Sequence, residues 1–184
     1  MQTTFGDPSP IPHPLPQSTR VVFRTEHFHL RWVHCSTTAD FLADFYAGVQ
    51  AQDRSDAQIK ELRHGIGYLT NELVENAVKF RTTGDVEIEA GMENGDFLLR
   101  IANWIAPETS AQFQALLSEL VAGDPGDLLI QRIEANAAGG SGSGLGLLTL
   151  MSDYGVRMTW NFQPAGSGDH RVHLETLARL PLPA

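Results

Sequence analysis

Hydrophobic residues recur at steps of three and four between residues 56 and 80, where they are Ile59, Leu62, Ile66, Leu69, Leu73, Ala77 and Phe80. This spacing places them on one side of an α-helix, so the segment is predicted to be a helix with one buried stripe. A similar pattern over residues 41–49 predicts an earlier helix, which is expected to begin at residues 37–40.

Alternating hydrophobic and polar residues predict strands elsewhere. Residues 21–34 are strand-like, as are residues 86–90 and 97–103, and the Asn-Gly pair between the latter two predicts a tight hairpin. Residues 156–162 also alternate, and a turn after them leads to a last predicted strand at 172–180. Hairpins require antiparallel pairing, which excludes a parallel βαβ fold.

Helical patterns also follow Pro107, cover residues 128–137, and lead from a glycine-rich loop to residues 154–155. Together these elements predict an α+β fold. We expect a two-layer α/β sandwich, with a mixed but mostly antiparallel sheet and with helices on one face.

The 184 residues suit a single domain. Residues 1–18 hold five of the ten prolines and are predicted to be a flexible, extended tail, the alternative being a proline-rich docking peptide. Residues 19–184 are predicted to form the domain, with an N-terminal layer at 19–55 and a core at 56–180.

The composition limits the class of function. The net charge is −9 and no block of basic residues occurs, which argues against a nucleic-acid partner. Cys35 is the only cysteine, so an internal disulfide is excluded. The sequence contains no apolar run of about 18 residues, which is the length that would predict a membrane span. We therefore expect a cytoplasmic protein without a membrane partner.

The helix predicted at residues 56–80 carries polar residues beside its buried stripe, in the stretch ELVENAVKF. Glu72, Asn76 and Lys79 share one face because each residue advances a helix by about 100°. They form either a half-buried polar site or a solvated face with a Glu–Lys pair. Asparagine is a poor residue for a helix interior, which favours the polar site.

Residues 139–147, GGSGSGLGL, lead directly into a predicted helix. Glycines let backbone N–H groups approach an anion, and a helix N-terminus adds unpaired N–H groups and a partial positive charge. The loop is therefore either a phosphate-binding site or a flexible linker. It is not a Walker loop, because no Gly-Lys-Ser/Thr follows, and it does not match the dinucleotide fingerprint.

The two motifs in this order resemble those of the GHKL ATPase superfamily, over residues 56 to about 178. The stretch from Glu72 is similar to the family's N-box, and Gly142 to Leu147 is similar to its second glycine box. The resemblance implies the Bergerat-type fold, with ATP and Mg²⁺ as cofactors. It implies Asn76 as the Mg²⁺ ligand and Glu72 as the general base.

The resemblance also implies that Lys79 and the glycine-rich loop bind the phosphates. The implied loop residues are Gly140, Ser141, Gly142, Ser143, Gly144, Leu145 and Gly146. One family motif is replaced, because Asn103 stands where the family has an adenine-reading aspartate and the glycines after it are missing. Asn103 is still expected to accept a hydrogen bond from the base. Trp104 is expected either to stack on the base or to fill the space.

This combination is similar to small stand-alone bacterial regulators, the SiaB-like and anti-sigma-factor serine kinases. It implies an ATP- and Mg²⁺-binding signalling protein that phosphorylates Ser or Thr on a partner. The implied partner is a STAS-like antagonist or a response regulator. The alternative is a degenerate fold that binds such a partner without catalysis. Related domains often dimerise through their N-terminal layer, so the resemblance allows a homodimer.

Overall fold

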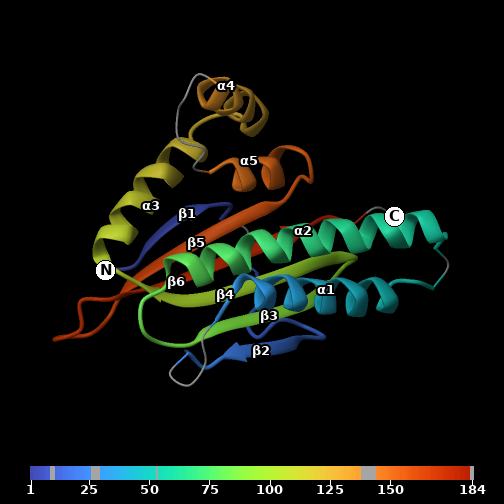
Figure 1. Ribbon diagram of the computed structural model, residues 1–184, viewed down its shortest axis with the longest axis horizontal. Helices are drawn as coiled ribbons and strands as arrows, with labels where there is room; N and C mark the ends of the chain where they lie inside the picture. The colour runs from blue at the N-terminus through green and yellow to red at the C-terminus, as the bar shows by residue number, and fades with distance from the viewer. Residues whose placement is uncertain (9–10, 26–29, 53, 138–143, 183–184) are drawn as a thin grey trace.

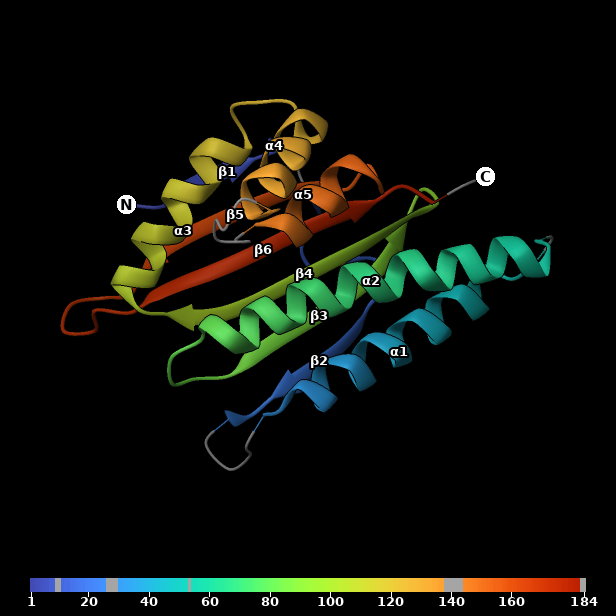
Figure 2. The same ribbon diagram turned by 45° about the horizontal axis from the view of Figure 1, so that its top comes forward.

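The computed structural model describes residues 1–184 apart from 9–10, 26–29, 53, 138–143 and 183–184. Its centre is a six-stranded sheet in the order β1-β5-β6-β4-β3-β2. The helices pack on one face of this sheet (Figure 1, Figure 2). The prediction of an α+β two-layer sandwich is confirmed. The sheet is not mixed, however, because each pair of neighbouring strands is antiparallel.

The strands are β1 (Thr3–Gly6), β2 (Thr19–Phe23), β3 (Val86–Glu93), β4 (Asp96–Ile105), β5 (Arg157–Pro164) and β6 (Val172–Leu180). The helices are α1 (Trp32–Val49), α2 (Asp56–Phe80), α3 (Pro107–Leu120), α4 (Pro125–Ala137) and α5 (Leu145–Ser152). Within the described part of the chain, every helix is too short or too polar to cross a lipid bilayer.

Two elements agree closely with their local sequence signals. Helix α2 has the predicted bounds, and it begins after Ser55, whose side chain accepts a hydrogen bond from the N–H of Gln58. The β3–β4 hairpin turns at Asn94 and Gly95, which have φ values of 53° and 88°. A two-residue turn between antiparallel strands requires such left-handed values, which asparagine and glycine tolerate.

The strand predicted over residues 21–34 is wrong at residues 24–25 and 30–34, whereas residues 26–29 lie outside the described part of the chain. Strand β2 ends at Phe23, and α1 begins at Trp32, well before the predicted helix start. The Thr37 hydroxyl donates to the Val33 carbonyl at 2.7 Å, one helical turn earlier. This threonine therefore lies inside the helix, although threonine near a predicted helix start is more typical of a cap.

The flexible tail predicted for residues 1–18 is wrong at residues 3–6 and at Leu15, whereas residues 9–10 lie outside the described part of the chain. Residues 3–6 form the edge strand β1, which pairs with β5, because they precede the first proline and keep their backbone donors. Farther along, Leu15 is 3% exposed and its N–H donates to Glu89 Oε1 at 2.8 Å. Glu89 alternates with the core residue Ile88, so Leu15 covers the sheet face opposite the helices.

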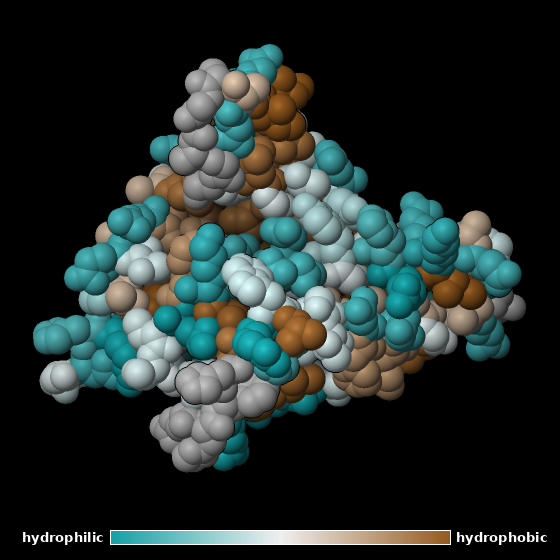
Figure 3. Space-filling view, in the orientation of Figure 1, coloured by the Kyte–Doolittle hydropathy of each residue, from teal (hydrophilic) through white to brown (hydrophobic). Residues whose placement is uncertain are grey.

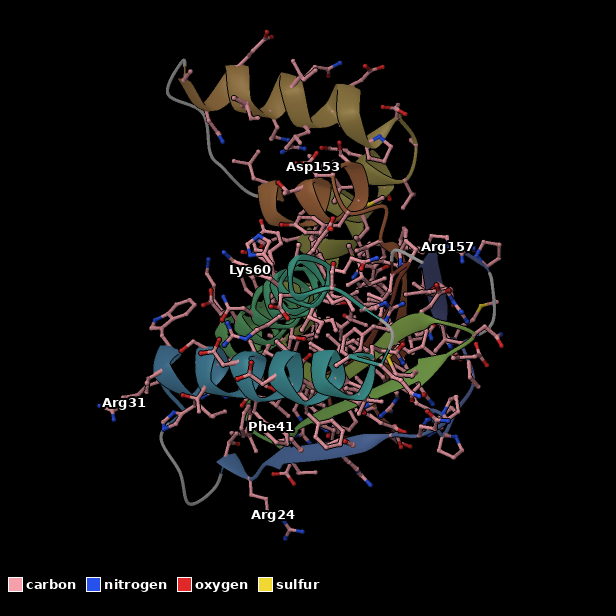
Figure 4. All side chains as sticks on the ribbon, turned by 90° about the vertical axis from the view of Figure 1, so that its right-hand side faces the viewer. Arg24, Arg31, Phe41, Lys60, Asp153 and Arg157 are labelled. Atoms are coloured by element: carbon pink, nitrogen blue, oxygen red, sulfur yellow. The ribbon has the colours of Figure 1, made fainter. Side chains whose placement is uncertain are left out.

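The hydrophobic core lies between the sheet and the helices. In the end view, α1 lies beside β2 and α4 lies at the opposite end of the molecule, with α2 and α5 between them (Figure 4). Tyr46 of α1 is 1% exposed, and its hydroxyl accepts from the Thr19 N–H and donates to the Ala90 carbonyl. This tyrosine therefore joins the helix layer to β2 and β3.

Charged side chains occupy the sheet face opposite the helices. Arg100 of β4 is 9% exposed, and its Nε donates to Glu175 Oε1 of β6 at 2.6 Å. Its Nη1 lies 3.9 Å from carboxylate oxygens of both Glu87 and Glu89 of β3. Asn161 of β5 donates to the second oxygen of Glu175 at 3.0 Å. This network links four neighbouring strands.

Replacing Glu175 by glutamine is expected to destabilise the protein at neutral pH. Burial raises the pKa of Glu175, but hydrogen bonds from Asn161 and Arg100 outweigh it, so the folded-state pKa is lowered. A lowered carboxyl pKa contributes stability above the unfolded-state pKa and loses it as the pH falls through the folded-state pKa. We expect Glu175→Gln to reduce the free energy of unfolding by about 1–3 kcal/mol near pH 7.

Urea denaturation at several pH values measures this effect. The difference in the free energy of unfolding between Glu175→Gln and wild type should shrink as the pH falls below about 4, where carboxyl groups become protonated. Glu134→Gln, at an exposed position of α4 away from its first turn, is the control and should change little. A difference that stays constant from neutral to acidic pH would contradict the ionic origin.

Candidate functional site

A cavity of about 330 Å³ lies between α2, the sheet, α3 and α5. The space-filling view shows a hydrophobic hollow between α3 and α5 (Figure 3). Helices and central strands both supply its apolar walls, which consist of Leu73, Ala77, Phe80, Ile105, Phe113, Leu116, Leu145, Leu147, Trp160 and Leu174. A cavity of this size, with apolar walls and a few polar groups, is typical of a small-molecule site.

Helix α2 contributes three predicted site residues to one wall of the cavity, namely Glu72, Asn76 and Lys79. The helical repeat brings them to this side, next to the stripe that packs on the sheet. Glu72 and Asn76 are partly buried, whereas Lys79 is exposed and its Nζ lies 4.9 Å from the ring centre of Phe80. The polar face of α2 therefore belongs to a cavity and is not simply a solvated surface.

Strand β4 places Asn103 and Trp104 on opposite faces of the sheet, as successive residues of a strand must lie. Asn103 is 2% exposed and lines the cavity. Trp104 instead contacts Arg171, whose guanidinium lies 4.8 Å from the ring centre, and His173, whose ring centre is at 4.9 Å. Trp104 therefore packs on the face of the sheet away from the cavity, and the expectation that it stacks on a base is wrong.

The start of α5 forms another wall of the cavity, through Gly144, Leu145 and Gly146. Gly144 precedes the helix with a φ of 86°, a left-handed conformation that favours glycine. The first N–H groups of a helix lack intrahelical partners and carry a partial positive charge, which suits an anion. The other predicted loop residues lie outside the described part of the chain; they are Gly140, Ser141, Gly142 and Ser143.

Glu72 and Gly146 touch each other across the cavity. A Cβ atom built on Gly146 would lie 2.0 Å from Glu72 Oε2, so the carboxylate occupies the space that a side chain would need. The carboxylate thus lies against the first turn of α5. Burial, and secondly the negative charge of Glu75, raise the pKa of Glu72. A raised pKa brings a carboxylate closer to the range in which a general base works at neutral pH.

Three further polar residues line the cavity and were not predicted: Thr109, Gln112 and Thr176. Thr176 of β6 pairs with Ile101 of β4, a core residue, so its side chain faces the helices. The alternation of hydrophobic and polar residues along the strand predicted at 172–180 already indicates that Thr176 shares a face with the core residues. Thr109 and Gln112 lie on α3, and no local pattern reveals that this helix borders the cavity.

The residues of the cavity fit a nucleoside phosphate with Mg²⁺. The apolar walls and the buried amide of Asn103 suit a base, and the first turn of α5 suits phosphate groups. Asn76 offers a neutral side-chain oxygen, which is a suitable ligand for Mg²⁺ when water and phosphate oxygens complete its coordination.

Comparison with known proteins supports the fold. No family model matches this chain, and no curated protein matches it. A solved structure, the SiaB-SiaC complex from Pseudomonas aeruginosa, contains a similar chain with a TM-score of 0.63 and 10% identity, covering 88% of this chain and 89% of that chain. At this identity the likeness shows a shared fold across most of both chains. It agrees, at the level of the fold, with the resemblance to SiaB-like regulators.

Replacing Gly146 by alanine is expected to raise the melting temperature less than helix propensity alone would, because the flexible end of the Glu72 side chain must move away from the new methyl group. Helix propensity favours alanine over glycine by about 1 kcal/mol, so the shortfall would report the contact and not the backbone. In the Glu72→Ala background the same replacement should give the full increase. Thermal denaturation without ligand measures both effects.

Gly48→Ala in α1 is the matched control, since a Cβ at that position meets nothing within 4 Å. We expect this control to raise the melting temperature slightly. If Gly146→Ala changed the melting temperature equally with and without the Glu72 side chain, the contact between Glu72 and Gly146 would not influence the replacement.

Proposed function

We propose that this protein is a GHKL-type regulatory kinase. It binds ATP and Mg²⁺ in the cavity between α2 and α5 and transfers a phosphoryl group to a serine or threonine of a partner protein. The observation that carries the proposal is the meeting of Glu72, Asn76, Asn103 and Gly146 in one cavity. These residues come from α2, β4 and α5, which are well separated in the chain.

Each polar group has a task in this proposal. The N–H groups at the start of α5 bind phosphate oxygens, and Lys79 reduces the negative charge around them. Asn76 provides an oxygen ligand for Mg²⁺, which, when bound, neutralises charge on the phosphates. Asn103 and the apolar walls hold the base. Phosphoryl transfer depends mainly on such positioning and charge stabilisation.

Glu72 is the general base of the proposed reaction. Its carboxylate accepts the proton of the serine or threonine hydroxyl while that oxygen bonds to the γ-phosphorus. The bond from the γ-phosphorus to the bridging oxygen breaks, and ADP leaves with that oxygen. A phosphate at the start of α5 repels the carboxylate from its contact with Gly146, which frees it to face the incoming hydroxyl.

A partner protein is part of the proposal because the structural neighbour is described as a complex of two proteins. The shared fold and the cavity support a role in signalling through a STAS-like antagonist or a response regulator. The second candidate function is partner binding without catalysis. Asn103, which replaces the aspartate expected at that position, is the observation in favour of this alternative.

Titration calorimetry with ATP tests the proposed site. Wild type is expected to bind ATP more tightly with Mg²⁺ than without it, by about tenfold or more. Asn76→Ala should lose this gain and bind ATP with the same affinity whether or not Mg²⁺ is present. Glu72→Gln should still bind but, with water as the acceptor in the absence of a partner, form ADP and phosphate at least about a hundredfold more slowly, since it lacks the base. Glu61→Gln, at an exposed position of α2, is the control. Absence of binding at millimolar ATP would leave only the non-catalytic function.

The pH dependence of ADP formation tests the role of Glu72 separately. The base must be ionised, and burial and Glu75 raise its pKa, so the rate should fall on acidification at a higher pH than for an ordinary glutamate. Glu75→Gln removes the negative charge that raises the pKa of Glu72. In this variant the rate should therefore begin to fall at a lower pH, with no change in the plateau rate at higher pH. An unshifted profile would mean that another group controls the acid limb.

A further inference from the structure

A second hollow lies on the sheet face opposite the helices and has no part in the proposed reaction. Its volume is about 410 Å³, which is enough for a small molecule. Ala102 of β4 lies between Glu87 of β3 and Glu175 of β6, and its small side chain leaves room between these larger neighbours. Trp104 and His173 line the hollow beside this alanine.

One wall of the hollow is fixed by its own contacts. The guanidinium of Arg171 lies 4.8 Å from the ring centre of Trp104, and its Nη1 donates to the Thr83 carbonyl at 2.7 Å. Its Nε and Nη2 donate to the carboxylate of Asp169 at 3.0 and 2.7 Å. A Cβ built on Gly84, which has a φ of 126°, would lie 2.8 Å from Trp104 Cδ1, so the backbone approaches the indole as only glycine allows. Arg171 is therefore already paired and shapes the wall.

Two charged residues at the hollow have no partner. Arg24 and Asp85 both line it, and neither forms a hydrogen bond or an ion pair within the described part of the chain. The register of β2 and β3, continued by one residue, places them opposite each other. Arg24 points away from the helix layer (Figure 4). The other carboxylate of the hollow, that of Glu87, lies 2.8 Å from Arg20 Nη2 and is already paired.

His173 adds hydrogen-bonding atoms beside these two charges. Its ring centre lies 4.9 Å from that of Trp104, and burial lowers its pKa. The imidazole is therefore neutral at pH 7, with one donor and one acceptor nitrogen. The hollow thus combines one unpaired positive charge, one unpaired negative charge, a neutral polar ring and an indole.

We propose that this hollow binds a free amino acid in its zwitterionic form. The ammonium group lies at Asp85, the carboxylate at Arg24, and the side chain against Trp104 and His173. A zwitterion gives both unpaired charges a charge-assisted hydrogen bond, whereas a simple anion or cation serves one and leaves the other. This inference does not depend on the proposed function, because the hollow is on the opposite face of the sheet and needs no nucleotide.

Thermal denaturation and titration calorimetry with the common L-amino acids, one at a time and at up to about 10 mM, test this proposal. At least one amino acid is expected to raise the melting temperature and to give a binding isotherm. Its N-acetyl derivative lacks the ammonium group, and its amide derivative lacks the carboxylate. Each derivative should bind at least about tenfold more weakly than the amino acid.

Two variants assign the charged contacts. Asp85→Asn should bind the amino acid more weakly and no longer distinguish it from the N-acetyl derivative. Arg24→Gln should also bind more weakly and no longer distinguish it from the amide. Asp153→Asn is the matched control, since this exposed aspartate lies at the end of α5 in the helix layer (Figure 4). Melting without ligand establishes that each variant is folded.

The proposal is wrong if none of the amino acids binds wild type. It is equally wrong if the amino acid that binds tolerates the loss of its ammonium group or of its carboxylate. Wild-type affinity and discrimination in either Asp85→Asn or Arg24→Gln would place the binding site elsewhere. A failure to bind ATP would count against the proposed function and leave this inference untouched.

Discussion

The packing of α2 on the sheet is the constraint on which both the core and the cavity depend. One stripe of this helix packs against β3, β4 and β6, and the residues beside the stripe line the cavity. Since neighbouring residues are about 100° apart around the helix axis, burying Leu73 and Ala77 also fixes the direction of Glu72 and Asn76. Helix α5 then meets α2 at the contact between Glu72 and Gly146. Structural and chemical requirements are therefore combined in a single helix.

Much of the fold could be predicted from the sequence because its signals are local. The bounds of α2 follow from a regular hydrophobic repeat and the cap at Ser55. The β3–β4 hairpin follows from Asn94-Gly95, whose conformational preferences suit the turn. The grouping of Glu72, Asn76 and Lys79 follows from the helical repeat in the same way. Their meeting with Asn103 and Gly146 was expected only through the resemblance to a family, since no local rule connects α2 with β4 and α5.

The wrong predictions concern features that depend on distant parts of the chain. A proline-rich segment has few ways to pair locally, yet Leu15 is held by the side chain of Glu89, a residue of β3. Trp104 looks suited to a base, but the register of β4 turns it toward Arg171 and His173, which arrive with β6 and the loop before it. Likewise, the place of Thr109 and Gln112 depends on how α3 lies over the sheet. Such contacts become visible only when the whole tertiary structure is known.

The pairing of β1 with β5 has a consequence for how the chain is made. Residues 3–6 leave the ribosome long before their partners at residues 159–162 have been synthesised. The central strand β4 likewise gains its β6 neighbour only when residues 172–180 have emerged. Contacts between such distant segments form slowly, because a long loop must close first. The sheet therefore cannot be completed until residues 172–180 have emerged. A nascent chain interrupted before β5 lacks the partner of its edge strand β1, and it lacks the part of the cavity wall that Trp160, Leu174 and Thr176 supply.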